Sequence, residues 1–183
     1  MRIILMLFII LFPLCSIAAD SETEAIKFLE IFDGLCLQNN EKFDNIEKVI
    51  YNIPNKVLLS PDELAAGHPL LAGRGKGYGV KIDGQFFVVG WIENISCGVT
   101  LDKVSIKTLK KLIKSNYHIE TIDVTSEGMQ VSETYMFKKD SDYKGGIIAL
   151  IYSKIKMNSK GAALNYLPER EVRKVLRKRS NDK

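Results

Sequence analysis

The sequence is poor in the residues that mark the common specialised classes of protein. Its 183 residues include three cysteines, two histidines, five prolines and thirteen glycines. So few cysteines exclude a disulfide-dense miniprotein, and so few glycines and prolines exclude collagen. A hydrophobic fraction of 46% is too high for a chain that is disordered throughout. We expect one globular domain, because a mature chain of about 165 residues can bury a single hydrophobic core.

Catalytic and metal-binding motifs are also missing. The chain has no Gly-x-Ser-x-Gly nucleophile elbow, and His68 and His118 have neither the cysteine nor the carboxylate spacing of a metal site. Glu127 and Glu133 are interpreted as a turn residue and a solvent-facing strand residue, not as a catalytic pair of carboxylates. A formal net charge of +4 is too small to favour nucleic acid as a partner. We therefore expect no cofactor, no metal and no enzymatic activity.

A string of glycines runs from Gly73 to Gly79 and is interrupted by Arg74, Lys76 and Tyr78. The backbone amides of such a string can surround an anion. The string is neither a P-loop nor a dinucleotide-binding fingerprint, because both of these open a helix and this string precedes a strand. We interpret it as a flexible loop, and anion binding stays open.

The N-terminal residues have the order of a secretory signal peptide. Arg2 is followed by an apolar run from Ile3 to Leu14 and then by small residues up to Ala19. The run has about a dozen residues, whereas a membrane-spanning helix needs roughly twenty, and no later segment is apolar enough to span a membrane. We expect residues 1–19 to be removed and the mature protein to be periplasmic or secreted. The alternative to ordinary cleavage is lipidation of Cys15.

Two cysteines, Cys36 and Cys97, remain after such a cleavage. An even number of cysteines in an oxidising compartment favours a disulfide. A disulfide would also exclude a cysteine nucleophile, because it removes the thiolate. The alternative is a pair of buried free thiols.

Apolar residues at helical spacing predict several helices. The predicted helices cover residues 21–39, residues 44–51, a short segment from Ser60, and residues 103–116. Ser21 and Glu24 have the spacing of a capping box and are expected to begin the first helix. Val49 is expected to face inward in the second helix, and Asp102 to cap the last one.

Alternating or continuous apolar segments predict the strands, which cover residues 80–82, 85–92, 94–100, 117–125, 129–137 and 146–157. The Asp83-Gly84 pair favours a tight turn between the first two. We expect an α+β fold with an antiparallel sheet of about five strands, formed by a hairpin and a C-terminal three-stranded meander. The N-terminal and central helices are expected to pack on one face of this sheet. A single domain over residues 20–168 is then followed by a basic tail, residues 169–183, that is either a frayed helix or disordered.

The last predicted helix carries lysines at helical spacing, with no acidic residue between them. These are Lys103, Lys107, Lys110, Lys111 and Lys114. We expect them to share one face, which is a candidate binding surface for an acidic protein or an anionic envelope surface. The basic tail is a second candidate contact. The alternative is that both are only solvated.

Three segments resemble short exported proteobacterial proteins of unknown function. They are Phe32-Asp33-Gly34-Leu35-Cys36-Leu37 at the end of the first helix, Cys97-Gly98-Val99 in a strand, and a final strand that runs into Ser159 to Pro168. The resemblance implies export and a disulfide, but it implies no catalytic residue.

Together these features predict an exported, non-catalytic protein that acts by binding. An accessory or inhibitor protein for an unknown protein partner is the leading hypothesis. Two alternatives stay open: a secreted hydrolase whose site the sequence does not reveal, and an envelope protein that associates with a membrane surface through the lysine-rich face.

Overall fold

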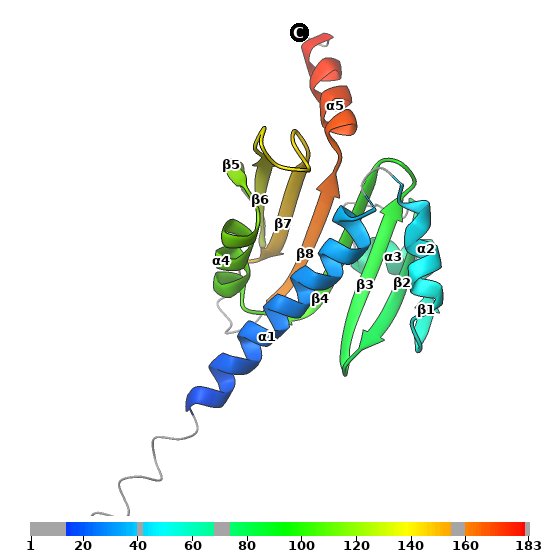
Figure 1. Cartoon of the computed structure of the whole chain (residues 1–183), viewed down its shortest axis with the longest axis vertical. Coiled ribbons are helices and arrows are strands. Elements are labelled where there is room, and N and C mark those ends of the chain that lie inside the picture. The colour runs from blue at the N-terminus through cyan, green and yellow to red at the C-terminus, as the bar shows by residue number, and fades with distance from the viewer. Residues whose placement is uncertain (1–13, 40–41, 68–73, 155–159, 182–183) are drawn as a thin grey trace, which may run out of the picture.

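A large antiparallel sheet forms the centre of the structure, a computed structural model that describes residues 14–39, 42–67, 74–154 and 160–181 (Figure 1). The described part has an α+β fold with eight strands. The helices are α1 (Leu14–Phe32), α2 (Asp44–Tyr51), α3 (Pro61–Gly67), α4 (Ile106–Asn116) and α5 (Glu169–Asn181). The strands are β1 (Lys56–Leu58), β2 (Lys76–Ile82), β3 (Gln85–Ile92), β4 (Ser96–Val104), β5 (Ile119–Glu127), β6 (Gln130–Phe137), β7 (Ile147–Ser153) and β8 (Lys160–Leu167).

The sheet consists of two four-stranded meanders joined side by side. The strand order is β1-β2-β3-β4-β8-β7-β6-β5, so β4 of the first meander pairs with β8 of the second. The chain leaves the centre of the sheet at β4 and reaches the far edge at β5, and α4 lies in this connection. The hairpin between β2 and β3 turns at Asp83 and Gly84, as predicted, with positive φ at both residues.

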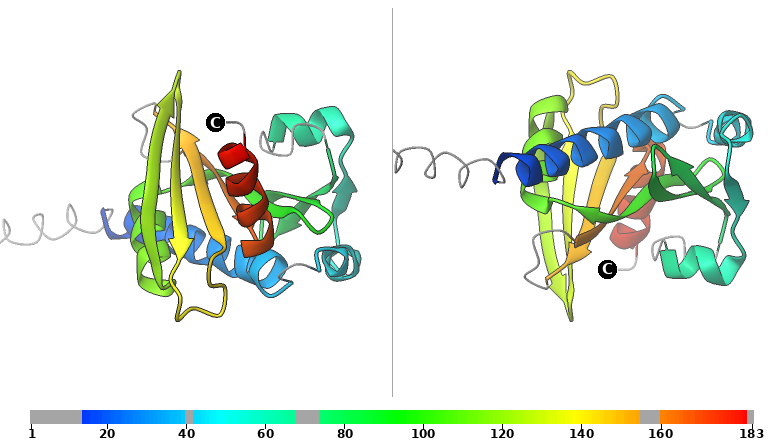
Figure 2. Two further views of the ribbon diagram at one scale, coloured as in Figure 1. Left: turned by 90° about the horizontal axis from the view of Figure 1, so that it is seen from above. Right: turned by 90° about the horizontal axis from the view of Figure 1, so that it is seen from below.

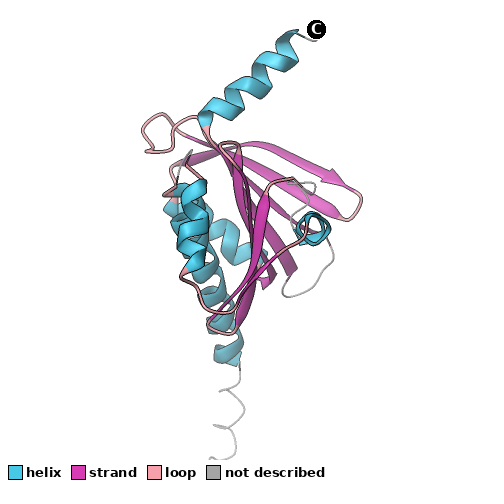
Figure 3. Cartoon of the chain, turned by 90° about the vertical axis from the view of Figure 1, so that its right-hand side faces the viewer, coloured by secondary structure: helices cyan, strands magenta, loops and turns pink. Residues whose placement is uncertain are grey.

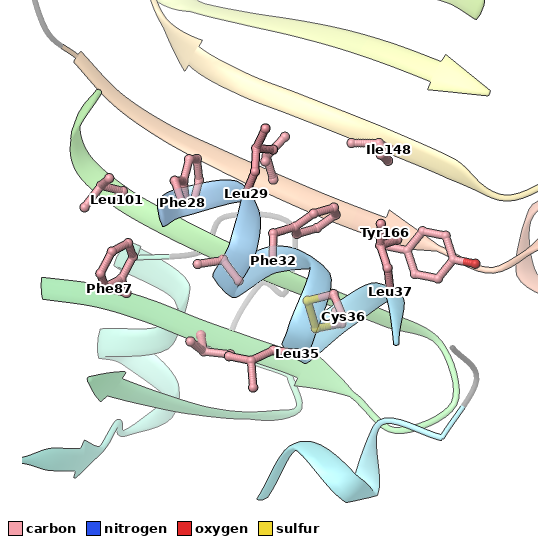
Figure 4. Close-up of a cluster of buried hydrophobic side chains, with 14 of the residues drawn as sticks. Phe28, Leu29, Phe32, Leu35, Cys36, Leu37, Phe87, Leu101, Ile148 and Tyr166 are labelled. Carbon is pink, nitrogen blue, oxygen red and sulfur yellow. A yellow bond between two sulfur atoms is a disulfide. The ribbon is translucent and has the colours of Figure 1, made fainter. Parts of the chain in front are cut away.

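One face of the sheet carries α1 and α4 and holds the main hydrophobic core, whereas α3 lies on the opposite face (Figure 2). Phe28 and Phe32 of α1 share a buried cluster with Phe87 of β3 and Leu101 of β4 (Figure 4). Leu109 of α4 belongs to the same cluster. Because the two helices and the sheet share this core, they form one unit.

The number of strands is higher than the sequence predicts: about five are expected, and the described part has eight. The prediction lacks β1, which pairs over only three residues. It also lacks β8, because Gly161 and the two alanines that follow it have a low strand propensity. The strand expected over residues 146–157 ends at Ser153, and residues 155–159 lie outside the described residues. The C-terminal meander therefore has four strands, not three.

The first two helices differ in detail from their predictions. Helix α1 begins at Leu14, so Ser21 lies within the helix and is not its N-cap. Helix α2 covers the predicted residues, but Val49 is 45% exposed, because the helix packs through Ile46 and Ile50.

Helix α4 begins later than predicted. Asp102 and Lys103 extend strand β4, and the helix starts at Ile106. Its N-cap is Ser105, whose hydroxyl oxygen accepts a hydrogen bond from the backbone N–H of Thr108. The predicted cap at Asp102 is therefore wrong.

A π-helical turn, η1 (Asp33–Leu37), follows α1. The backbone N–H of Gln38 donates to the carbonyl oxygen of Asp33, five residues earlier, at 2.9 Å. This wide turn buries the three consecutive residues 35–37. One of them, Cys36, forms a disulfide with Cys97 of β4, with a Cα–Cα distance of 5.4 Å. The predicted disulfide is thus present, and it joins the end of α1 to the middle of the sheet.

The glycine string is not a loop over most of its length, because β2 begins at Lys76. A Cβ atom at Gly77 would lie 2.3 Å from Cδ1 of Leu64 in α3. At Gly79 it would lie 2.5 Å from the ring of Phe86. Close packing accounts for both glycines, and Gly73 lies outside the described residues.

The structure describes the two ends of the chain only in part. Of the predicted signal peptide, residues 1–13 lie outside the described residues, and residues 14–19 are the first turns of α1. At the other end, the basic tail forms α5, which projects away from the sheet (Figure 3). Among the helices of the described residues, none combines the length and apolarity needed to cross a membrane.

Candidate functional sites

The five candidate lysines do not share one free face. Lys103 lies on strand β4, and Lys110 turns inward from α4 toward the sheet. Lys107, Lys111 and Lys114 are exposed on α4, and no ion pair is found for any of these three in the described part of the chain. We call these three residues the α4 lysine surface.

Lys110 belongs to a polar cluster between α4 and the sheet. Its ammonium group forms an ion pair with Glu133 of β6 and donates a hydrogen bond to the Tyr152 hydroxyl at 2.7 Å. Glu133 accepts hydrogen bonds from the hydroxyl groups of Tyr152, at 2.7 Å, and Tyr135, at 2.6 Å. The Lys110 nitrogen also lies 4.6 Å from the centre of the Tyr152 ring. Each carboxylate oxygen of Glu133 thus has a donor.

The ionisation of this cluster follows from its contacts. Burial opposes the charge on Glu133, but the donors Lys110, Tyr135 and Tyr152 outweigh burial, so the pKa of Glu133 lies below its ordinary value. Burial likewise opposes the charge on Lys110, yet its contacts with Glu133 and Tyr152 raise its pKa above the ordinary value. Burial and the neighbouring carboxylate both raise the pKa of Tyr135. The ion pair is therefore charged at neutral pH.

The interpretation of Glu133 as a solvent-facing residue is wrong, since its side chain is 11% exposed. Strand alternation could have placed it correctly, because it lies in phase with Val131, Tyr135 and Phe137, which point to the helix-covered face. Lysine, glutamate and tyrosine are residue types found in acid–base catalysis. Here each of them binds another member of the cluster beneath α4. The arrangement holds α4 on the sheet.

A second polar pair lies at the π-helical turn. The Tyr117 hydroxyl donates a short hydrogen bond to Oδ1 of Asp33. Burial raises the pKa of Asp33, the hydrogen bond from Tyr117 lowers it, and the negative charge of Glu30 raises it; the net shift is upward. Burial and Asp33 together raise the pKa of Tyr117 far above its ordinary value. This pair joins η1 to the residue that follows α4.

The face of the sheet opposite α1 carries a slot that the sequence analysis did not identify. It is a pocket of about 500 Å³ across the strands β4, β8, β7, β6 and β5. The residues that line it and bear on its chemistry are Thr100, Ala163, Ile151, Gln130, Met129 and Glu127. The hydroxyl oxygen of Thr100 is buried and has no hydrogen-bond partner in the part of the chain that the structure describes. The pairing registers that create this slot leave no local pattern in the sequence.

Three basic residues of α5 pair with acidic neighbours, unlike the lysines of the α4 lysine surface. Arg173 pairs with Glu169 at 2.6 Å, and Lys174 pairs with Glu171 at 2.7 Å. Arg170 contacts Glu171 as well. The two glutamates offset two of the six basic charges of α5, so the helix keeps a net charge of +4 and stays a candidate contact.

Of the two histidines, only His118 lies in the described part of the chain. His118 pairs with Asp140 at 2.9 Å, and His68 lies outside the described residues. Within residues 14–39, 42–67, 74–154 and 160–181, no three side chains of histidine, cysteine, aspartate or glutamate gather as metal ligands.

Comparison with known proteins adds no family to this description. No family model matches the chain, and neither a curated protein nor a solved structure does. The resemblance to short exported proteobacterial proteins therefore stays a hypothesis.

Proposed function

We propose that this chain is an exported, non-catalytic protein, periplasmic or secreted, that binds a protein partner as an accessory or inhibitor protein. The α4 lysine surface is the proposed contact, and an acidic patch on the partner is its complement. The N-terminal sequence pattern and the buried disulfide support the compartment.

The observation that carries the proposal is the set of three exposed lysines on α4. Lys107, Lys111 and Lys114 stand exposed on a helix without an acidic residue, and they are not used in ion pairs of the described residues. Such charges attract an oppositely charged surface and accelerate encounter with it. Lys110 is excluded from the contact because the polar cluster already uses it.

The test is charge reversal of the α4 lysine surface, as K107E/K111E/K114E. The matched control reverses three exposed lysines on the β6–β7 connection, as K138E/K139E/K144E, so that both variants have the same net charge. Tagged protein is used to capture partners from an envelope fraction at about 20 mM and about 150 mM salt, since exposed charges are screened over a Debye length of about 8 Å at the higher salt. We expect an acidic protein to be recovered by the wild type and the control, less at high salt, and to be lost with K107E/K111E/K114E.

Equal recovery by the two variants would contradict the proposal. Vesicles with about one third anionic phospholipid serve as a separate probe of the membrane alternative. Binding of such vesicles that K107E/K111E/K114E abolishes, without any captured protein, would assign the surface to a membrane instead.

A further inference from the structure

The slot lies on the face of the sheet opposite α1, and its length and width can be derived from the strand pairing. Thr100 pairs with Ala163, and Ala163 pairs with Ile151, so these three residues form one row across β4, β8 and β7. Gln130 of β6 and Glu127 of β5 pair with each other and continue the lining to the edge of the sheet. Four strand spacings give a length of roughly 19 Å. A volume of about 500 Å³ then leaves a slot about 5 Å across, which is the width of a single extended chain.

The chemistry of the lining changes along the slot. Ala163 and Ile151 form an apolar floor, and Met129 adds a flexible apolar side chain at the hairpin turn. Glu127, at the β5 end, is the only charged residue among the described residues that line the slot. Thr100, at the β4 end, has a buried hydroxyl oxygen without a hydrogen-bond partner among the described residues. Because this oxygen is closed to solvent, it does not face a molecule bound in the slot.

We infer that the slot binds a linear aliphatic amine in its protonated form. The ammonium group pairs with Glu127, and the aliphatic chain lies on Ala163 and Ile151. Glu127 disfavours a carboxylate or a phosphate, and among the described residues no lysine or arginine lines the slot to offset it. The inference is independent of the proposed function, because the slot and the α4 lysine surface lie on opposite faces of the sheet.

The inference can be tested with three probes of equal length: hexylamine, hexan-1-ol and hexanoate. Each is titrated into isotopically labelled protein, and the backbone amide signals are followed by NMR. We expect hexylamine to shift the signals of Ile151, Ala163 and Gly161 saturably, hexan-1-ol to bind more weakly at the same place, and hexanoate to leave these signals unchanged.

Variants separate charge from shape. Glu127→Gln should weaken hexylamine binding by up to about fivefold, the upper limit for an exposed ion pair, and leave hexan-1-ol unaffected. Glu120→Gln is the matched control, because Glu120 is an exposed acid of the same strand that does not line the slot. Gly161→Leu should fill the slot and abolish binding of both probes. A Cβ atom at Gly161 has room, since its nearest neighbour, the Asp102 carbonyl oxygen, would be 3.5 Å away.

Three results would overturn the inference. The first is hexanoate binding with the same affinity as hexylamine. The second is a set of shifted amide signals that lie away from the slot. The third is hexylamine binding that Gly161→Leu leaves unchanged. The thermal transition of each variant is recorded alongside, so that loss of binding is assigned to the slot only in a variant that is folded.

Discussion

Replacing Glu133 by glutamine should destabilise the fold more than any change at an exposed charge, because it breaks the polar cluster beneath α4. The glutamine side chain keeps the shape and can still accept one hydrogen bond. It leaves the Lys110 ammonium without a counter-charge and weakens the hydrogen bonds from Tyr135 and Tyr152. Hydrogen bonds to a charged group contribute about 1.5–3 kcal/mol, and removing one partner of a fully buried ion pair costs about 3–5 kcal/mol.

The destabilisation expected for Glu133→Gln is smaller than the about 3–5 kcal/mol of a fully buried ion pair, because Lys110 is 29% exposed and can turn toward water. We expect a loss of about 2–3 kcal/mol in the free energy of unfolding. Lys110→Met should cost less, about 1–2 kcal/mol, since Glu133 keeps both tyrosine donors. The double variant should cost less than the sum of the two, because the residues are in contact.

Urea denaturation followed by circular dichroism measures these free energies. A loss of about 2–3 kcal/mol corresponds to a decrease of about 5–10 °C in Tm for a domain of this size. Lys107→Met, on the same helix, is the control and should change the stability by less than about 0.5 kcal/mol. The folded pKa of Glu133 is lowered, so its contribution is present above the unfolded pKa of about 4.3 and is lost as the pH falls further. The difference between the wild type and Glu133→Gln should therefore shrink in acid.

Two results would refute this reasoning. One is a Glu133→Gln variant as stable as the wild type at neutral pH. The other is a larger cost for Lys110→Met than for Glu133→Gln, which would mean that the lysine chain contributes by packing and not by charge.

Three further perturbations test other parts of the structure. Reduction of the Cys36–Cys97 disulfide, whose residues are separated by 61 positions, should lower the free energy of unfolding by about 4 kcal/mol at most, as measured by urea denaturation with and without reductant. The folded pKa of Asp33 is raised, so the wild type should lose stability as the pH rises from about 4 to about 7, whereas Asp33→Asn should not. The urea midpoint of the variant should therefore rise relative to that of the wild type over this interval, and an unchanged difference would contradict this. Thr100→Val should raise the free energy of unfolding by up to about 1 kcal/mol and raise Tm slightly, since the hydroxyl oxygen has no hydrogen-bond partner among the described residues; a lower Tm would show that the hydroxyl is bonded in solution.

The sequence predicts well those parts of the fold that depend on residues close together in the chain. The boundaries of α2 and the Asp83-Gly84 turn follow from local spacing and local conformational preference, and the structure has both. The disulfide follows from the predicted oxidising compartment and from the even number of cysteines that remain after signal cleavage. In each case the evidence lies within a few residues, or is independent of the fold.

The remaining features depend on contacts that a single sequence does not specify. Gly161 and its neighbours form a central strand because β4 and β7 lie on either side, although their own preference for a strand is weak. Lys110 has the same spacing as the lysines around it, and only the position of Glu133 on β6 distinguishes it. The slot is formed by five strands, and its residues share no spacing in the sequence.

The pairing of β4 with β8 determines when the sheet can be completed. Val99 pairs with Leu164, so β4 of the first meander cannot complete its pairing until β8, the last strand of the described chain, is present. Until β8 pairs with them, β4 and β7 each have an unpaired edge with apolar side chains. Pairing between strands as far apart in sequence as β4 and β8 also slows folding. A chain interrupted after β7 would hold two half-sheets with exposed edges that can pair with other copies. The small residues of β8 thus complete the fold by closing a gap, and this final step protects the chain from association with itself.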